Sequence, residues 1–246
     1  MPRTGTTVVC GSLLTHPEML CYGELFHDNP DIRQSEAQRT TMGAGWKFDK
    51  SLGWGVDTPD INQPAQPYLE KFFSTNVPAK AVGFKILFHQ VTQGPNCDAW
   101  EFIANNPDVR IIRMRRENLL EIICSYVRAS MTRTWHNTGG LTSKPNRYII
   151  PPDQCEKLFR KFTAIPHTMR NIEETHNVLD VEYTDICHDF QRVMNRIEEF
   201  LEVSKRDNVR PYLEKIAVLR PDEELANYQE LKQYFSKTEY AGYFCF

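Results

Sequence analysis

The sequence predicts an α/β protein with a mostly parallel central sheet flanked by helices. Three observations support this prediction: short apolar segments of strand length, amphipathic segments with helical spacing between them, and basic residues where predicted strands pass into helices. Strands that alternate with helices favour parallel pairing, because each helix carries the chain back across the sheet. Ligands of such sheets bind at the carboxyl ends of the strands.

Length and composition fit one globular domain over residues 1–246, with 41% hydrophobic and 25% charged residues. The formal net charge of −3 gives no general attraction to nucleic acid, so nucleic acid is not an expected partner and any anion site must be local. Apolar runs are too short for a membrane span or a secretory signal.

Seven cysteines are scattered along the chain without a paired Cys-x-x-Cys spacing. An odd number without that spacing indicates reduced thiols rather than disulfides or zinc ligands, and a cytoplasmic location. No metal is expected.

Residues 3–7, Arg-Thr-Gly-Thr-Thr, open onto the apolar residues Val8 and Val9. Small residues around a glycine suit a tight turn that feeds a helix, here expected over residues 8–14 and ended at His16-Pro17. The first N–H groups and the dipole of such a helix bind anions, so the turn is a candidate phosphate cradle. It lacks the Gly-Lys-Ser/Thr of nucleoside triphosphate sites.

The first half of the chain then alternates between loops, strands and helices. We predict a long loop over a site at 41–67, a helix at 68–74, a buried strand at 81–88, a helix at 100–104, a strand at 109–114, and a helix from about 118.

The second half begins with an irregular segment over residues 131–152 and a helix over 153–174 that is disturbed at Pro166. Residues 177–183 predict a strand. The clearest amphipathic helix follows, because its apolar residues recur at helical spacing: Phe190, Val193, Met194, Ile197, Phe200 and Leu201.

Two motifs together resemble a known family. The Arg3–Thr7 turn, paired with Arg115-Arg116 and Ser125 after a strand-like run, resembles the phosphate-binding motifs of sulfotransferases that use 3′-phosphoadenosine 5′-phosphosulfate (PAPS). The resemblance covers most of the chain and is strongest to the bacterial and carbohydrate-type branch, judging by Gly23-Glu24 and the double arginine. It implies a P-loop-like fold whose first strand is missing or truncated, because only two residues precede Arg3.

The resemblance implies a nucleotide-binding set of residues. Arg3 and the N–H groups of residues 4–7 would bind the 5′-phosphate, helped by the hydroxyls of Thr6 and Thr7, so the set in the cradle is Arg3, Thr4, Gly5, Thr6 and Thr7. Arg116 and Ser125 would bind the 3′-phosphate, with Arg115 as a competitor for the arginine role.

Two further residues have nucleotide-binding interpretations and ordinary ones. Tyr183 would lie near the adenine, or it packs in the core. Lys215 resembles a C-terminal basic residue near the nucleotide, but a surface lysine also fits.

Three residues are catalytic candidates. Glu24 matches the glutamate that the carbohydrate-type branch uses as general base, and a solvated loop carboxylate is the alternative. His89, after an apolar strand, is the rival base or a structural histidine. Lys85, inside the predicted strand at 81–88, either stabilises the transferring sulfonate or extends to solvent from a strand edge.

We therefore expect an enzyme that transfers a sulfuryl group from PAPS to an acceptor hydroxyl of a small molecule, sugar or glycolipid. One rival is a P-loop kinase, disfavoured because neither Gly-Lys-Ser/Thr nor an obvious magnesium site accompanies the cradle. A second is an inactive nucleotide-binding or scaffold protein. The oligomeric state stays open, with a homodimer as one option.

Overall fold

A computed structural model describes residues 3–27, 29, 31, 59–60, 63–74, 79–91, 96–135, 147–164, 169, 171–211, 213 and 219–246. The chain divides into two compact units. The first comprises residues 1, 5–114 and 166–212, and the second comprises residues 2–4, 115–165 and 213–246. The division into two compact units does not test the expectation of a single domain over residues 1–246, which stays a prediction.

Among the described residues, the strands form two pairs. β1 (Met19–Glu24) pairs in parallel with β2 (Ala81–Lys85), with Met19 opposite Ala81. β3 (Ile111–Arg115) pairs with β4 (Val178–Glu182). The sequence prediction of an α/β fold with parallel pairing is therefore confirmed.

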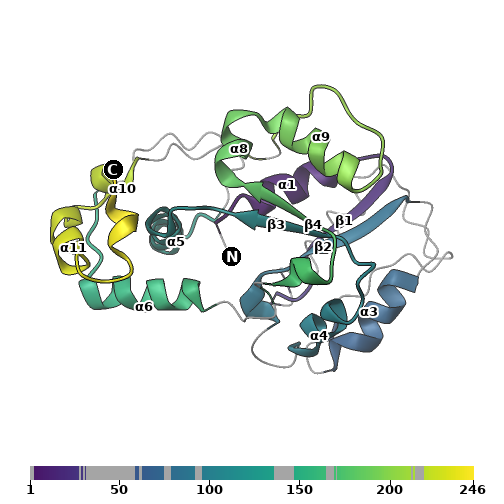
Figure 1. Cartoon of the computed structure of the whole chain (residues 1–246), viewed down its shortest axis with the longest axis horizontal. Coiled ribbons are helices and arrows are strands. Elements are labelled where there is room, and N and C mark those ends of the chain that lie inside the picture. The colour runs from purple at the N-terminus through teal and green to yellow at the C-terminus, as the bar shows by residue number, and fades with distance from the viewer. Residues whose placement is uncertain are drawn as a thin grey trace. The chain divides into compact units, whose positions relative to one another are not determined.

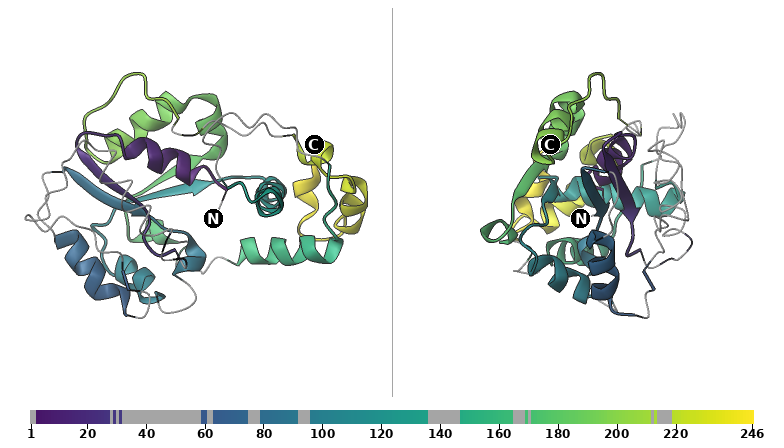
Figure 2. Two further views of the ribbon diagram at one scale, coloured as in Figure 1. Left: turned by 180° about the vertical axis from the view of Figure 1, so that it is seen from behind. Right: turned by 90° about the vertical axis from the view of Figure 1, so that its right-hand side faces the viewer.

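Helices cover both faces of the strands in the first unit (Figures 1 and 2). On one side lie α1 (Thr6–Leu13), α8 (Tyr183–His188) and α9 (Phe190–Phe200), and on the other lie α3 (Ala65–Ser74) and α4 (Asp98–Ala104).

The side chains of β1 alternate between these two layers. Met19 and Cys21 pack in the core of α1 and α9, whereas Leu20 and Tyr22 pack in the core of α3. A strand buried on both faces reads as a continuous apolar run, as Met19–Tyr22 does.

Several element boundaries differ from the sequence predictions. β1 had no predicted strand, and α3 begins at Ala65, inside the predicted loop at 41–67, most of which lies outside the described residues. The strand expected over 81–88 ends at Lys85, and the short helix η2 (Phe88–Gln90) follows it. The residues ahead of Arg3, where a missing or truncated first strand was predicted, lie outside the described residues.

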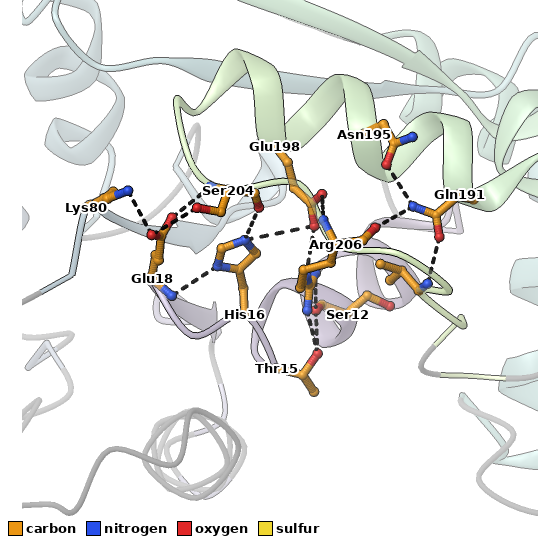
Figure 3. Close-up of polar contacts among 11 residues, drawn as sticks. Ser12, Thr15, His16, Glu18, Lys80, Gln191, Asn195, Glu198, Ser204 and Arg206 are labelled. Atoms are coloured by element: carbon orange, nitrogen blue, oxygen red, sulfur yellow. Dashed lines mark hydrogen bonds and ion pairs between the residues drawn. The ribbon is translucent and has the colours of Figure 1, made fainter.

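A polar network holds the C-terminal end of α1 to the segment after α9 (Figure 3). The buried His16 accepts a hydrogen bond from the Glu18 N–H at Nδ1, so Nε2 carries the proton and donates it to Ser204 O at 2.9 Å. Arg206 binds the buried carboxylate of Glu198 through Nε at 2.8 Å and also donates to Ser12 O. The helix that starts at the candidate cradle is therefore fixed at its far end.

The second unit is mainly helical, with α5 (Leu119–Thr132), α6 (Pro152–Thr163), α10 (Pro221–Glu224), α11 (Tyr228–Tyr234) and the short helix η4 (Ala241–Phe244). Asn118 caps α5 by accepting the N–H groups of Leu120 and Glu121. A buried ion pair joins α5 to α10, since Arg128 Nη1 lies 2.6 Å from Glu224 Oε1. Part of the irregular segment predicted at 131–152 is helical, because α5 extends to Thr132.

The helix predicted over 153–174 ends earlier than expected. α6 stops at Thr163, residues 165–168 lie outside the described part, and the short helix η3 (Ile172–Glu174) occupies the end of the range. No helix in the described ranges is long and apolar enough to cross a membrane.

Candidate active site

The cradle turn leads into α1 as the sequence predicts. Gly5 is the N-cap residue of α1 and adopts a left-handed conformation with φ 84°. The first helical hydrogen bonds run from the N–H groups of Val8 and Val9 to Gly5 O, at 3.0 and 3.2 Å. Helix geometry gives the N–H groups ahead of these no intrahelical acceptor, so those of Gly5, Thr6 and Thr7 suit an anion.

Only glycine fits position 5. A Cβ there would lie 3.0 Å from Ile186 Cδ1 and 3.2 Å from Tyr183 Cδ2, and the positive φ would strain any other residue. The Tyr183 ring therefore lies directly against the cradle turn. Glycine at this position lets the Ile186 and Tyr183 side chains pack closely against the turn from which α1 begins.

Lys85 links the cradle helix to Glu24. Its Nζ donates to Thr7 Oγ1 at 2.9 Å and to Glu24 Oε1 at 2.5 Å. The side chains are mostly buried, at 10% exposure for Lys85 and 16% for Glu24. The Lys85 side chain therefore does not extend to solvent from a strand edge. Glu24 is not a solvated loop carboxylate, because it is the last residue of β1 and forms an ion pair with Lys85.

The surroundings of Glu24 keep it ionised. Burial works to raise the pKa of its carboxyl, but the charge and hydrogen bond of Lys85, the amide of Gln90 and the more distant His27 together outweigh it. The net result is a pKa below the ordinary value for glutamate. Glu24 is therefore a carboxylate at neutral pH, as a general base must be.

η2 carries both Gln90 and His89, and Gln90 reaches Glu24. Gln90 is 3% exposed and donates from Nε2 to Glu24 Oε2 at 2.7 Å. His89 is half-buried, and its ring stands edge-on to Phe88 with 5.9 Å between ring centroids. The Glu24 carboxylate thus accepts hydrogen bonds from both Lys85 and Gln90.

The second unit gathers Arg3, Arg116 and Ser125. Arg3 Nε donates to Ser125 Oγ at 2.9 Å, and Arg3 Nη1 donates to Trp135 O at 2.6 Å. Arg116 is 9% exposed and donates from Nη1 to Arg3 O at 3.2 Å. The predicted 3′-phosphate pair, Arg116 and Ser125, therefore meets at the arginine that was expected to bind the 5′-phosphate.

Arg116 is also fixed by a carboxylate. Its Nε and Nη2 both donate to Glu121 Oε2, at 2.9 and 2.7 Å. Arg115, the last residue of β3, is exposed, and Thr4 is fully buried. Of the two neighbouring arginines, Arg116 is thus the buried one, and Glu121 in the first turn of α5 orients its guanidinium.

Sequence reasoning missed Gln90 and Glu121. Gln90 directly follows the predicted His89, and Glu121 follows Arg116 by five positions, but neither spacing marks a site. Lys215 lies outside the described residues. Within the described ranges there is no group of three or more His, Cys, Asp or Glu that could hold a metal ion.

The first unit thus places a glycine turn at a helix start, an ammonium and a carboxylate close together, and the turn and the ammonium are groups that suit an anionic ligand. A family model described as the sulfotransferase family matches residues 1–207, and the chain belongs to that family.

The chain is also similar to known relatives in sequence and to a solved structure in fold. The chain is 24% identical to nodulation protein H of Rhizobium meliloti strain 1021 over 250 residues, which cover 99% of this chain and 92% of the relative. It is 23% identical to nodulation protein H of Rhizobium tropici over 249 residues, covering 99% and 90%. The crystal structure of a sulfotransferase from Alicyclobacillus acidocaldarius superposes with a TM-score of 0.50 at 16% identity, covering 95% of this chain and 87% of that one.

Proposed function

We propose that this sulfotransferase uses PAPS as its donor and transfers the sulfuryl group to a hydroxyl of a sugar, glycolipid or other small molecule. The observation that carries the proposal is the hydrogen-bonded series Thr7, Lys85 and Glu24, which joins a phosphate-type cradle to a cation and a carboxylate. The resemblance of both phosphate motifs to PAPS-dependent sulfotransferases supports the choice of donor.

The donor would supply a sulfuryl group on a phosphate leaving group. The N–H groups of Gly5, Thr6 and Thr7, with Arg3, would bind the 5′-phosphate. Arg116 and Ser125 would bind the 3′-phosphate through charge-assisted and hydroxyl hydrogen bonds. Tyr183, whose ring lies against Gly5, is the proposed neighbour of the adenine.

Lys85 and Glu24 would share the chemistry. The Lys85 ammonium neutralises negative charge that develops on the leaving phosphate, for which it exchanges its bond to Glu24. Glu24 Oε1, released by that exchange, takes the proton of the acceptor hydroxyl as its oxygen attacks sulfur. His89 is the alternative base. A cation and backbone amides neutralise the charge, so the proposal includes no metal.

Calorimetric titration with adenosine 3′,5′-bisphosphate in the absence of magnesium tests the donor assignment. We expect binding that weakens strongly for the 3′-dephospho nucleotide. Transfer from ³⁵S-labelled PAPS to a panel of phenols, monosaccharides and oligosaccharides then tests the reaction. Magnesium-dependent binding of ATP instead would favour a kinase, and nucleotide binding without any transfer would favour an inactive nucleotide-binding protein.

A further inference from the structure

Gln90 has an unusually constrained side chain. It ends η2, it is 3% exposed, and its Oε1 accepts the Leu87 N–H at 2.9 Å. That bond directs the amide nitrogen to the other side, where Nε2 donates to Glu24 Oε2 at 2.7 Å. The amide is therefore oriented by the backbone of its own turn before it reaches the carboxylate.

The two oxygens of Glu24 have partners of different kinds. Oε1 accepts from the flexible, charged Lys85, which also donates to Thr7. Oε2 accepts from the neutral, locked amide of Gln90. In the proposed function Lys85 leaves Oε1 for the donor phosphate, whereas Gln90 stays bound to Oε2.

We propose that Gln90 is a positioning residue that fixes the Glu24 carboxylate for proton removal from the attacking hydroxyl. This inference rests on the proposed function, in which Glu24 is the base and Lys85 turns to the donor. Once Lys85 has moved away from Oε1, the Glu24 carboxylate is free to rotate unless its other oxygen, Oε2, is still bound. A neutral amide supplies that bond and lowers the pKa of Glu24 less than the Lys85 cation does.

Geometry explains why such a clamp matters. Reacting groups must lie within about 3–3.5 Å in a suitable direction, and misplacement by about 1 Å costs on the order of 10²-fold in rate. Gln90 makes no contact with the acceptor in this proposal. Its effect passes entirely through Glu24, and this separates it from a residue that only supports the fold.

A double-mutant cycle tests the inference, with hydrolysis of ³⁵S-labelled PAPS to free sulfate as the probe, so that water is the acceptor. Gln90→Met keeps the length and removes both amide bonds. We expect kcat to fall roughly ten- to a hundred-fold with the affinity for adenosine 3′,5′-bisphosphate unchanged. In the Glu24→Gln background the same substitution should have less than about a two-fold effect, because the base is already absent.

Gln90→Glu is the second variant, since it keeps the shape and places a carboxylate against Glu24. The charged or titratable groups that act on Glu24 are Lys85 and His27, and a second carboxylate beside it opposes them. We expect the acid limb of the pH–kcat profile to move up by about one pH unit or more. Gln229→Met, at an exposed position of α11, is the matched control and should change neither quantity.

The outcomes separate the two proposals. Absence of nucleotide binding and of sulfate release in the unmodified chain would overturn the proposed function and this inference with it. An active chain in which Gln90→Met keeps its rate, or loses the same factor with and without Glu24, would overturn the inference alone. Misfolding of both Gln90 variants would assign Gln90 to the fold and would overturn it as well.

Discussion

Replacement of Gly5 by alanine tests the cradle turn directly. The left-handed conformation at φ 84° costs an L-residue about 1–2 kcal/mol. The new Cβ would also meet Ile186 Cδ1 at 3.0 Å and Tyr183 Cδ2 at 3.2 Å. Overpacking typically costs about 1–3 kcal/mol, and the lower half applies here because Cδ1 ends a flexible side chain. The two effects add to about 2–4 kcal/mol of lost stability.

Urea denaturation measures this loss, and titration with adenosine 3′,5′-bisphosphate measures its functional consequence. We expect the free energy of unfolding to fall by about 2–4 kcal/mol and the nucleotide affinity to fall at least about ten-fold, because the first N–H groups of α1 shift. Gly83→Ala is the matched control: a Cβ at Gly83 has no neighbour within 4 Å and its φ is not positive. Equal stability of the two variants would refute the steric argument, and unchanged nucleotide affinity in a destabilised Gly5→Ala protein would refute the cradle.

Four other measurements test the site and the fold. Glu24→Gln should lower kcat by roughly 10²–10⁴-fold with little change in donor affinity, and His89→Asn should cost much less; the reverse pattern would make His89 the base. Arg3→Ala should weaken adenosine 3′,5′-bisphosphate binding by ~2–3 kcal/mol, against no change for the exposed Arg192→Ala, and equal affinities would place Arg3 outside the site. In the proposed exchange Lys85 leaves Glu24 when the donor binds, so the acid limb of kcat should lie at higher pH than that of kcat/KM for the donor, and coincident limbs would argue against the exchange. An aromatic disulfide reagent should modify the exposed thiols at once and the buried ones only after unfolding, since burial raises the pKa of Cys155 to about 12; fast reaction of Cys155 in the native protein would contradict this. The exposed thiols are Cys97, Cys187 and Cys245, and the buried ones are Cys10, Cys21, Cys124 and Cys155.

Elements with a strong local pattern could be predicted from the sequence. α9 follows the helical spacing of its apolar residues, and β4 follows the apolar run after residue 177. β1 was missed because its apolar stretch, Met19–Tyr22, is short and buried on both faces, so it shows no alternation. A four-residue apolar run does not distinguish a strand from part of a buried helix.

Local patterns in the sequence point to the candidate site only where its residues lie close together, and the scattered candidates Glu24, Lys85 and Tyr183 come from the family resemblance. The cradle at residues 3–7 and the Arg116–Ser125 motif each combine a local turn or helix start with suitable side chains. The bond between Glu24 and Gln90 joins positions 66 apart, and the bond between Arg3 and Ser125 joins positions 122 apart. No local pattern encodes such contacts, because the packing of whole elements creates them.

The ion pair between Lys85 and Glu24 poses two requirements that at first conflict. A general base must be ionised, and the lowered pKa of Glu24 ensures this, but the same lowering makes the carboxylate a weak proton acceptor. Donor binding would change some of the influences on the Glu24 pKa and leave others in place. Burial, which raises it, persists, whereas the charge and hydrogen bond of Lys85, which lower it, would go to the donor phosphate. Glu24 would therefore become more basic when the donor is in place, so proton removal would be coupled to the presence of the group that the acceptor attacks.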